Sequence, residues 1–350
     1  MKGIMTLGKR IIESNVKRLS FPYKLTFLVT DKCNSRCMIC NIWKKKTKNE
    51  LTTKEIEKFF KKSNKFSWID VSGGEIFMRE DIVDIARIIL TNCKGLYLLH
   101  FPTNGLLPDL IEMKVKEIVA LKPKKLIISI SLDGPPALHD KLRGVPGGWQ
   151  KSIETYKKLK KIKNVEAYFG MTLSSYNVGK LEETYKSVKK LINNISYRDF
   201  HINIEHSSDH FYGSKAKQYP KKPIINEVRK FIKLRGFPHN PVFFLEHKYL
   251  NLVEKFLKSK KTPLPCKALT SSCYISAQGD VFPCSVFNKK LGNLRDFNYD
   301  IRKIWSLKDT KETLTMIKNG GCPHCWSPCE AYQTILGNLL NKNLHFPNSK

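Results

Sequence analysis

The chain has 350 residues, of which 41% are hydrophobic and 11% aromatic, the composition of a globular protein. It contains no run of about eighteen apolar residues, and its first residues lack the apolar core and cleavage site of a signal peptide. We therefore expect a cytoplasmic protein. The net charge of +31 favours an anionic partner such as nucleic acid, anionic lipid or a phosphorylated metabolite. Because lysines are spread along the whole chain, a general enrichment in surface lysine is an equally good explanation.

Residues 4–19 combine apolar positions at helical spacing with basic residues, which predicts an amphipathic basic helix. Such a helix can lie on a membrane surface, but more often it packs on its own domain. We expect five segments along the chain: this helix in 1–20, an α/β core in 21–240, a linking helix in 241–262, a cysteine-rich segment in 263–335 and a tail in 336–350.

From Lys24 onward, strand-like and helix-like segments alternate, as a parallel sheet with crossover helices requires. The predicted strands are Leu25–Thr30, Trp68–Ser72, Leu96–Phe101, Leu126–Leu132, Val165–Leu173 and Phe200–Glu205. The predicted helices are Thr52–Lys62, with a capping box of Thr52 and Glu55, then Asp81–Asn92, Asp109–Leu121, Trp149–Ile162, Leu181–Ile192, Ile224–Leu234 and Leu245–Lys258. This order predicts an α/β fold, a partial (β/α)6 TIM-like barrel, with its site at the carboxyl ends of the strands.

Cys33, Cys37 and Cys40 follow the first strand at C-x3-C-x2-C spacing. Three soft thiolates on one loop suit an iron–sulfur cluster, and because a cubane normally takes four cysteines, they leave either a distant fourth ligand or one open iron. A zinc site would need a fourth ligand nearby, and the next histidine is His100. A disulfide would leave one sulfur over.

Six further cysteines lie near the C-terminus, a density that core packing does not explain. They are Cys266, Cys273, Cys284, Cys322, Cys325 and Cys329. Ser272–Ile275 and Asp280–Phe282 predict a hairpin with Gly279 at its turn. The Cys322-x2-Cys325 pair would also suit zinc. The isolated Cys93 is predicted to be a core residue within a helix.

The cysteine loop, with Gly73-Gly74-Glu75 at the end of the next strand, resembles the radical S-adenosylmethionine (SAM) superfamily. The resemblance implies a [4Fe–4S] cluster whose open iron chelates SAM, and reductive cleavage of SAM to a 5′-deoxyadenosyl radical. Two departures from the family pattern, Ile76 for the usual proline and Ile39 for the usual aromatic residue, indicate a divergent subfamily.

Polar residues at the third and fourth strand ends are the kind that hold a ribose and a carboxylate, although they also suit ordinary turns. Ser131 to Gly134, His139 to Gly144 and Gly147 to Trp149 resemble the SLDG…RG…G-aromatic run of radical SAM enzymes, by which Arg143 would bind the SAM carboxylate. The candidate cofactor-binding residues are Gly73, Gly74, Glu75, Thr103, Asn104, Ser131, Asp133 and Arg143, with Ser129 nearby.

Gly279-x4-Cys284, followed by Cys322-x2-Cys325-x3-Cys329, resembles the SPASM/twitch domain that holds auxiliary clusters. We expect one auxiliary [4Fe–4S] cluster, with Cys266, Cys273 and Cys284 as ligands and a fourth from the last triplet; which four bind stays open. Sulfatase-maturing relatives carry an acidic base after the hairpin cysteine, where this chain has Ser285. Glu205 and Asp209 are weak substitutes, while His206 and His210 are read as loop residues facing solvent or substrate.

The predicted function is therefore a radical SAM enzyme that abstracts hydrogen from a peptide, a lipid or isoprenoid chain, or a cofactor precursor. The resemblance implies an electron donor such as ferredoxin or flavodoxin, and peripheral membrane contact is a further possibility. The alternatives are a non-catalytic iron–sulfur protein that binds nucleic acid through its charge, and a zinc protein.

Overall fold

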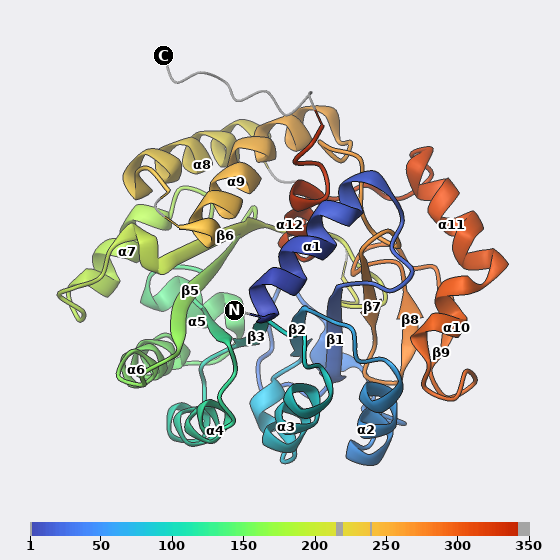
Figure 1. Ribbon diagram of the computed structural model, residues 1–350. Helices are drawn as coiled ribbons and strands as arrows, with labels where there is room; N and C mark the ends of the chain where they lie inside the picture. The colour runs from blue at the N-terminus through green and yellow to red at the C-terminus, as the bar shows by residue number, and fades with distance from the viewer. Residues whose placement is uncertain (1, 215–219, 239, 342–350) are drawn as a thin grey trace.

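The computed structural model describes residues 2–214, 220–238 and 240–341. One sheet runs through the molecule in the order β6-β5-β4-β3-β2-β1-β7-β8-β9 (Figure 1). Its parallel core consists of β1 (Lys24–Thr30), β2 (Trp68–Gly73), β3 (Leu98–Thr103), β4 (Lys125–Ser131), β5 (Glu166–Leu173) and β6 (Phe200–Ile204). The six predicted strands and the α/β class are confirmed.

The helices cover both sides of this sheet. Figure 1 shows α2 (Thr53–Lys62), α3 (Ile82–Asn92), α4 (Pro108–Ala120) and α6 (Gly148–Lys160) as an arc along one side. The others are α1 (Lys2–Val16), α5 (Pro136–Arg143), α7 (Leu181–Lys189), α8 (Lys221–Arg235), α9 (Pro241–Ser259), α10 (Ile301–Ser306), α11 (Lys308–Lys318) and α12 (Pro328–Leu336). Short 3-10 turns lie at Ile42–Lys44, Ile76–Met78 and Tyr197–Asp199.

The capping box at α2 is confirmed. Thr52 Oγ1 accepts from the Glu55 backbone N–H, and Glu55 accepts in return from Thr52 N. Two helices near the site, α5 and α12, were not predicted because each begins at a proline next to turn-forming residues. Proline favours the first turn of a helix as readily as it favours a turn, so the sequence alone does not separate the two. Cys93 lies at the C-terminal cap of α3, just outside the helix, and is buried in the core as predicted.

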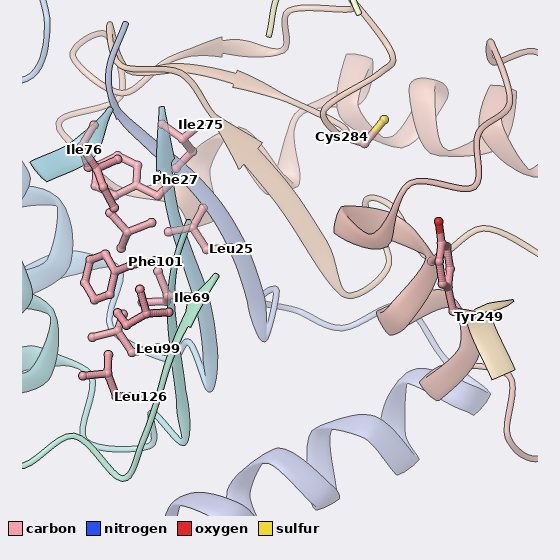
Figure 2. Close-up of a cluster of buried hydrophobic side chains, with 14 of the residues drawn as sticks. Leu25, Phe27, Ile69, Ile76, Leu99, Phe101, Leu126, Tyr249, Ile275 and Cys284 are labelled. Carbon is pink, nitrogen blue, oxygen red and sulfur yellow. The ribbon is translucent and has the colours of Figure 1, made fainter. Parts of the chain in front are cut away.

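Side chains alternate between the two faces of the parallel strands. Leu25, Phe27, Ile69 and Leu99 belong to the large apolar cluster, and Figure 2 shows them gathered on one side of the strands. The residues between them in sequence lie on the opposite face, which we call the inner face. It carries polar groups, and its charged or polar side chains include Lys24, Thr26, Asp70, His100 and Ser129.

The cysteine-rich segment continues the same sheet. β7 (Ser272–Ile275) pairs in parallel with β1, placing Ser272 opposite Lys24, and β8 (Asp280–Phe282) returns antiparallel as the predicted hairpin. β9 (Gly292–Asn293) forms the edge. The boundaries drawn at 240 and 262 stay a prediction, but β1 and β7 are hydrogen-bonded neighbours across them.

Candidate metal centres and cofactor site

The loop that carries Cys33, Cys37 and Cys40 begins where β1 ends, at the carboxyl end of the sheet. Its backbone is fixed from two sides. Arg36 N donates to Arg143 O, and Met38 N donates to Leu142 O; each N···O distance is 2.9 Å. On the other side, Asn41 N donates to Tyr212 O over 2.8 Å. The three thiols are thus presented by a loop whose position depends on α5 and on residues 206–214.

Gly73 and Gly74 lie directly against this loop. A Cβ at Gly73 would stand 2.3 Å from Thr30 O, and one at Gly74 would stand 2.3 Å from Lys32 O. Gly74 N donates to Thr30 O and Glu75 N donates to Lys32 O, each with an N···O distance of 2.8 Å. Within the protein, the glycines therefore allow the backbone of the cysteine loop to approach β2.

Glu75 is completely buried, and its carboxylate organises the end of β3. It accepts from Thr103 Oγ1 at 2.9 Å, from Asn104 N at 2.7 Å and from Phe77 N at 3.1 Å. Burial raises the pKa of Glu75 to about 7. Asn104 Nδ2 in turn lies 2.6 Å from Asn34 Oδ1 and 4.0 Å from Cys33 Sγ. Glu75 thus acts through Thr103 and Asn104 on the position of the cysteine loop.

Arg143 occupies the other flank of the thiols. Its Nη1 lies 3.8 Å from Cys37 Sγ, and its Nη2 lies 2.6 Å from Asp133 Oδ2. Nε of Arg143 is buried and has no hydrogen-bond partner within the described part of the chain. Asp133 also accepts from Thr172 N at 2.9 Å, while Ser131 ends β4 beside Gly170 of β5. The guanidinium therefore keeps a donor free for an anionic group near the thiols.

The loop suits a thiolate-bound cluster. Burial raises the pKa of the Cys33 thiol, and it raises that of Cys40 to about 12, so isolated thiols would stay protonated here. The positive charge of Arg143 and the amide of Asn104 lie where they would stabilise thiolate ligands. Three thiols on one loop, two donors beside them and one unpaired guanidinium nitrogen fit a cluster that binds an anionic ligand.

The C-terminal cysteines separate into two sets. Cys266, Cys284, Cys322 and Cys325 line one pocket, whose remaining wall is largely apolar. Backbone N–H groups approach two of the sulfurs: Phe287 N lies 3.2 Å from Cys284 Sγ, and Ala268 N lies 3.5 Å from Cys266 Sγ. Burial raises the pKa of Cys266 to about 12 and that of Cys284 well above its ordinary value. Four sulfurs around a pocket match the ligand number of a cubane.

Cys273 and Cys329 lie outside the lining of this pocket. Cys273 is fully buried in β7 and belongs to the apolar cluster on the outer face. Cys329 is the second residue of α12, and its carbonyl accepts from Lys24 Nζ and Gln333 Nε2. This arrangement differs from the expected set, which included Cys273. Among the described residues, no three His, Cys, Asp or Glu side chains are grouped closely enough to hold a single metal ion.

Residues 206–214 form a strap between the two cysteine groups. Tyr212 O lies 4.0 Å from Cys40 Sγ, and His210 Nε2 lies 2.9 Å from Cys284 O. His210 also stacks on Phe282 with ring centroids 4.3 Å apart. His206 packs near Phe256, so the two histidines do not converge as metal ligands would. Both are better described as structural residues of the strap.

The weak acid–base candidates differ in position. Glu205 is buried directly after β6, whereas Asp209 is exposed on the strap. Ser285 is buried beside Cys284, and its carbonyl accepts from Ser208 Oγ at 2.5 Å.

Comparison with known families assigns both cysteine groups. Residues 27–188 match the radical SAM superfamily model, and residues 266–330 match SPASM, an iron–sulfur cluster-binding domain. The chain is a radical SAM protein with a SPASM domain. The radical SAM match contains the cysteine loop, Gly73-Gly74-Glu75 and Arg143, while the SPASM match contains the six C-terminal cysteines. The resemblance noted from the sequence is confirmed.

Individual relatives are distant but extend over most of the chain. The antilisterial bacteriocin subtilosin biosynthesis protein AlbA of Bacillus subtilis is 24% identical, with 93% of this chain and 73% of AlbA covered. An AdoMet-dependent heme synthase of Methanosarcina barkeri is 25% identical, with 81% and 82% covered. These relatives act in different syntheses, so they do not fix a common substrate.

Solved structures share the fold. Native anSMEcpe with bound AdoMet aligns with a TM-score of 0.59 at 18% identity, covering 84% of each chain. Streptococcus suis SuiB bound to precursor peptide SuiA aligns with a TM-score of 0.58 at 20% identity, covering 88% of this chain and 69% of SuiB. The radical SAM protein therefore shares its fold with these solved structures.

Membership in the family establishes the cofactors: SAM, the [4Fe–4S] cluster that binds it, and auxiliary iron–sulfur in the SPASM domain. The protein is an enzyme of this superfamily. In the described ranges, no helix is both long and apolar enough to cross a membrane.

Proposed function

We propose that this enzyme reductively cleaves SAM and abstracts a hydrogen atom from a peptide. The observation that carries the proposal is the grouping of the three loop thiols with Arg143 and Asn104. Cys33, Cys37 and Cys40 would hold the SAM-binding cluster. When bound, the cluster and SAM supply a 5′-deoxyadenosyl radical from one electron delivered by a donor such as ferredoxin or flavodoxin.

The residues around the loop would bind and orient SAM. Arg143 would offer its guanidinium to the SAM carboxylate, for which a planar, permanently charged donor is well suited. Thr103, Asn104 and Ser131 lie at neighbouring strand ends, where ribose hydroxyls could be bound. Glu75 would hold Thr103 and Asn104 in place from below. Asp133 would orient Arg143 through their ion pair.

In the SPASM domain we propose Cys266, Cys284, Cys322 and Cys325 as the ligands of one auxiliary [4Fe–4S] cluster. The pocket that these four sulfurs share supports this set over one containing Cys273 or Cys329. Cys284→Ala and Cys325→Ala should each lower the iron content of reconstituted protein by about four atoms per chain. Cys273→Ala and Cys329→Ala are matched controls that should keep it. Loss of iron from either control would contradict the set.

A peptide is the favoured substrate class because the fold is shared with a solved complex of SuiB with precursor peptide SuiA, and AlbA is a bacteriocin biosynthesis protein. The test is anaerobic reconstitution with dithionite and SAM, with 5′-deoxyadenosine followed by chromatography and mass spectrometry. The probe is the peptide fraction below about 10 kDa from source cells grown in deuterated medium, because a deuterium in 5′-deoxyadenosine reports abstraction from the peptide.

The variant with Cys33, Cys37 and Cys40 all changed to alanine should form no 5′-deoxyadenosine while keeping the iron of the SPASM domain. Cleavage by this variant would refute the role of the loop. If the wild type cleaves SAM but the nucleoside gains no deuterium, the peptide class is wrong. If an intact cluster gives no cleavage at all, the protein is a non-catalytic iron–sulfur protein, and salt-dependent binding of nucleic acid becomes the next measurement.

We also propose that α1 docks on an anionic lipid surface. Met5, Ile12 and Val16 are 69%, 64% and 79% exposed on its outward face. Leu340, 66% exposed, adjoins them because its N–H donates to Asn15 Oδ1 at 3.0 Å. Exposed lysines 9 and 17 and the overall charge of +31 complement anionic headgroups.

Sedimentation with phosphatidylglycerol vesicles should recover the wild type, whereas phosphatidylcholine vesicles should not. The combined changes Met5→Ser, Ile12→Ser and Val16→Ser should abolish the recovery. Phe237→Ser is the control, because Phe237 is 86% exposed but lies outside this face. Equal recovery of all three proteins, or a dimer formed through α1 instead, would overturn the proposal.

A further inference from the structure

Four polar residues on neighbouring strands of the inner face form a continuous hydrogen-bonded chain. His100 Nε2 lies 2.9 Å from Ser129 Oγ, and His100 Nδ1 lies 3.2 Å from Asp70 Oδ1. Asp70 Oδ2 lies 2.9 Å from Lys24 Nζ, and Trp68 Nε1 donates to Asp70 Oδ1 at 2.8 Å. The chain therefore crosses the sheet from β1 through β2 and β3 to β4.

The protonation pattern follows from the chemistry of the partners. Burial alone would raise the pKa of Asp70, but the Lys24 ammonium and His100 outweigh it and hold the pKa well below its ordinary range. A carboxylate can only accept, so His100 Nδ1 carries the proton. In a neutral imidazole Nε2 is then an acceptor, and the Ser129 hydroxyl donates to it. This is the arrangement in which a histidine takes a proton through a hydroxyl.

The chain lies below the proposed SAM site, within the barrel. Three residues after His100, Thr103 contacts Glu75, and the rise of a strand places it roughly 10 Å further along β3. Beneath the chain, the inner-face residues Trp68, Leu98 and Ile127 form an apolar layer packed against α9 and α12. A quarter of the His100 side chain is accessible, whereas Lys24 is fully buried. His100 and Ser129 thus lie one inner-face position beyond this apolar layer, toward the carboxyl ends of the strands.

Two further buried polar groups lie on the inner side of the sheet: Glu330 of α12, which is close to Lys24, and Tyr274 of β7, which lies against Phe211. Glu330 accepts from Ser272 Oγ at 3.0 Å, while its Oε1 has no partner in the described residues. The Tyr274 hydroxyl, on an inner-face position of β7, is fully buried and likewise has no partner there. Buried polar atoms left without partners are uncommon in proteins. The Glu330 and Tyr274 oxygens are therefore available to a polar ligand group.

From this geometry we infer that His100 is the proton acceptor of the reaction, acting through Ser129 on the substrate, with Asp70 and Lys24 as its positioning residues. The inference rests on the proposed hydrogen abstraction from a peptide. After that abstraction, the substrate radical loses one proton to Ser129 Oγ as the Ser129 proton moves to His100 Nε2. The step also releases one electron, and the auxiliary cluster that Cys266, Cys284, Cys322 and Cys325 are proposed to hold would supply the one-electron acceptor. The substrate becomes unsaturated or cross-linked, and Ser129 is unchanged.

Two measurements test the inference without ambiguity about folding. The first is long-range 15N NMR of histidine-labelled full-length protein, which reports the tautomer of His100. The Nδ1–H form is expected in the wild type, and Asp70→Asn should convert it to the Nε2–H form because the asparagine amide can donate to Nδ1. A wild-type Nε2–H tautomer would overturn the inference without any reference to turnover.

The second measurement uses the reconstituted enzyme with the deuterated peptide fraction and SAM. In His100→Gln, deuterium transfer to 5′-deoxyadenosine should persist, while the oxidised peptide product should fall at least about a hundredfold. Imidazole added to His100→Ala should restore part of the product. Deuterium transfer with normal product in His100→Gln would overturn the role of His100 alone. Absence of deuterium transfer in the wild type would instead count against the proposed function.

Discussion

Arg143 Nη2 lies 2.6 Å from Asp133 Oδ2, and this ion pair joins the end of α5 to the end of β4 directly beside Cys37. Asp133 is 1% exposed, so its side of the ion pair is buried. We therefore expect the pair to affect both the stability of the fold and the affinity for SAM, so a single substitution would change both at once.

Arg143→Ala should weaken SAM binding and also destabilise the protein by about 3–5 kcal/mol, because it leaves a buried carboxylate unpaired. Adding Asp133→Asn should recover most of the stability but none of the SAM affinity. Urea unfolding and equilibrium SAM binding to the reconstituted protein separate the two effects. Unchanged SAM affinity in Arg143→Ala would remove this residue from the site.

Gly74→Ala should disrupt the cysteine loop, since the added Cβ would stand 2.3 Å from Lys32 O. Backbone must move to relieve such a contact, so we expect a loss of stability of about 2–4 kcal/mol and loss of iron from the N-terminal cluster. Gly8→Ala is the matched control: its Cβ meets nothing within 4 Å in α1, where alanine favours the helix. Full iron loading of Gly74→Ala, measured by iron and sulfide analysis, would show that the close approach is not required.

Burial raises the pKa of Glu330 from 4.5 to about 7. The folded state then binds more protons than the unfolded state between these values, so the free energy of unfolding should fall as pH rises through this window, by about 3 kcal/mol for this group. Urea unfolding at pH 5 and pH 8 measures the effect. Glu330→Gln should reduce the fall, and Glu57→Gln, half-exposed on α2, should not. An identical fall in both variants would show that Glu330 is not a source of the pH dependence.

Thr52→Ala should cost about 1 kcal/mol of stability, because the hydroxyl caps the first turn of α2. Thr52→Ser keeps the capping oxygen and should stay within a few tenths of a kcal/mol of the wild type. Thermal unfolding of both variants provides the comparison. A larger loss in Thr52→Ala would mean that the partner network of Glu55, which includes Arg295 at 2.6 Å, fails together with the cap.

Local patterns predicted the parallel strands and the cysteine loop well, because apolar runs and ligand spacing are properties of short segments. The surroundings of Cys273, the C-terminal cysteine that lies in β7, depend on which face of this strand it occupies. Cys273 and Tyr274 are neighbours that point to opposite faces, and only the pairing of β7 with β1 determines which one joins the large apolar cluster on the outer face. Long-range pairing of this kind leaves no local signal.

The polar chain on the inner face was also missed, although part of its signal was present. Lys24 directly precedes a predicted strand, and Asp70 and His100 each interrupt one. A charged residue inside such a strand indicates a buried partner, but not which one. Glu75 was expected to serve the SAM site directly. In the structure its carboxylate accepts four hydrogen bonds, from Thr103, Asn104 and Phe77. These contacts depend on the packing of segments far apart in the sequence, which the sequence pattern does not show.

The pairing of β1 with β7 has a consequence for the order in which the protein is made. Residues 31–271 separate the two strands, so at ribosomal rates roughly 10–50 s pass between the synthesis of β1 and that of β7. During that time one edge of β1 offers unpaired backbone groups to any passing strand. Lys24, which ends up fully buried, begins that edge and keeps it charged until Ser272 arrives. A nascent chain stalled before residue 272 should therefore bind chaperones. Lys24, which is buried in the folded protein, would also protect the unpaired edge of β1 from aggregation before β7 is made.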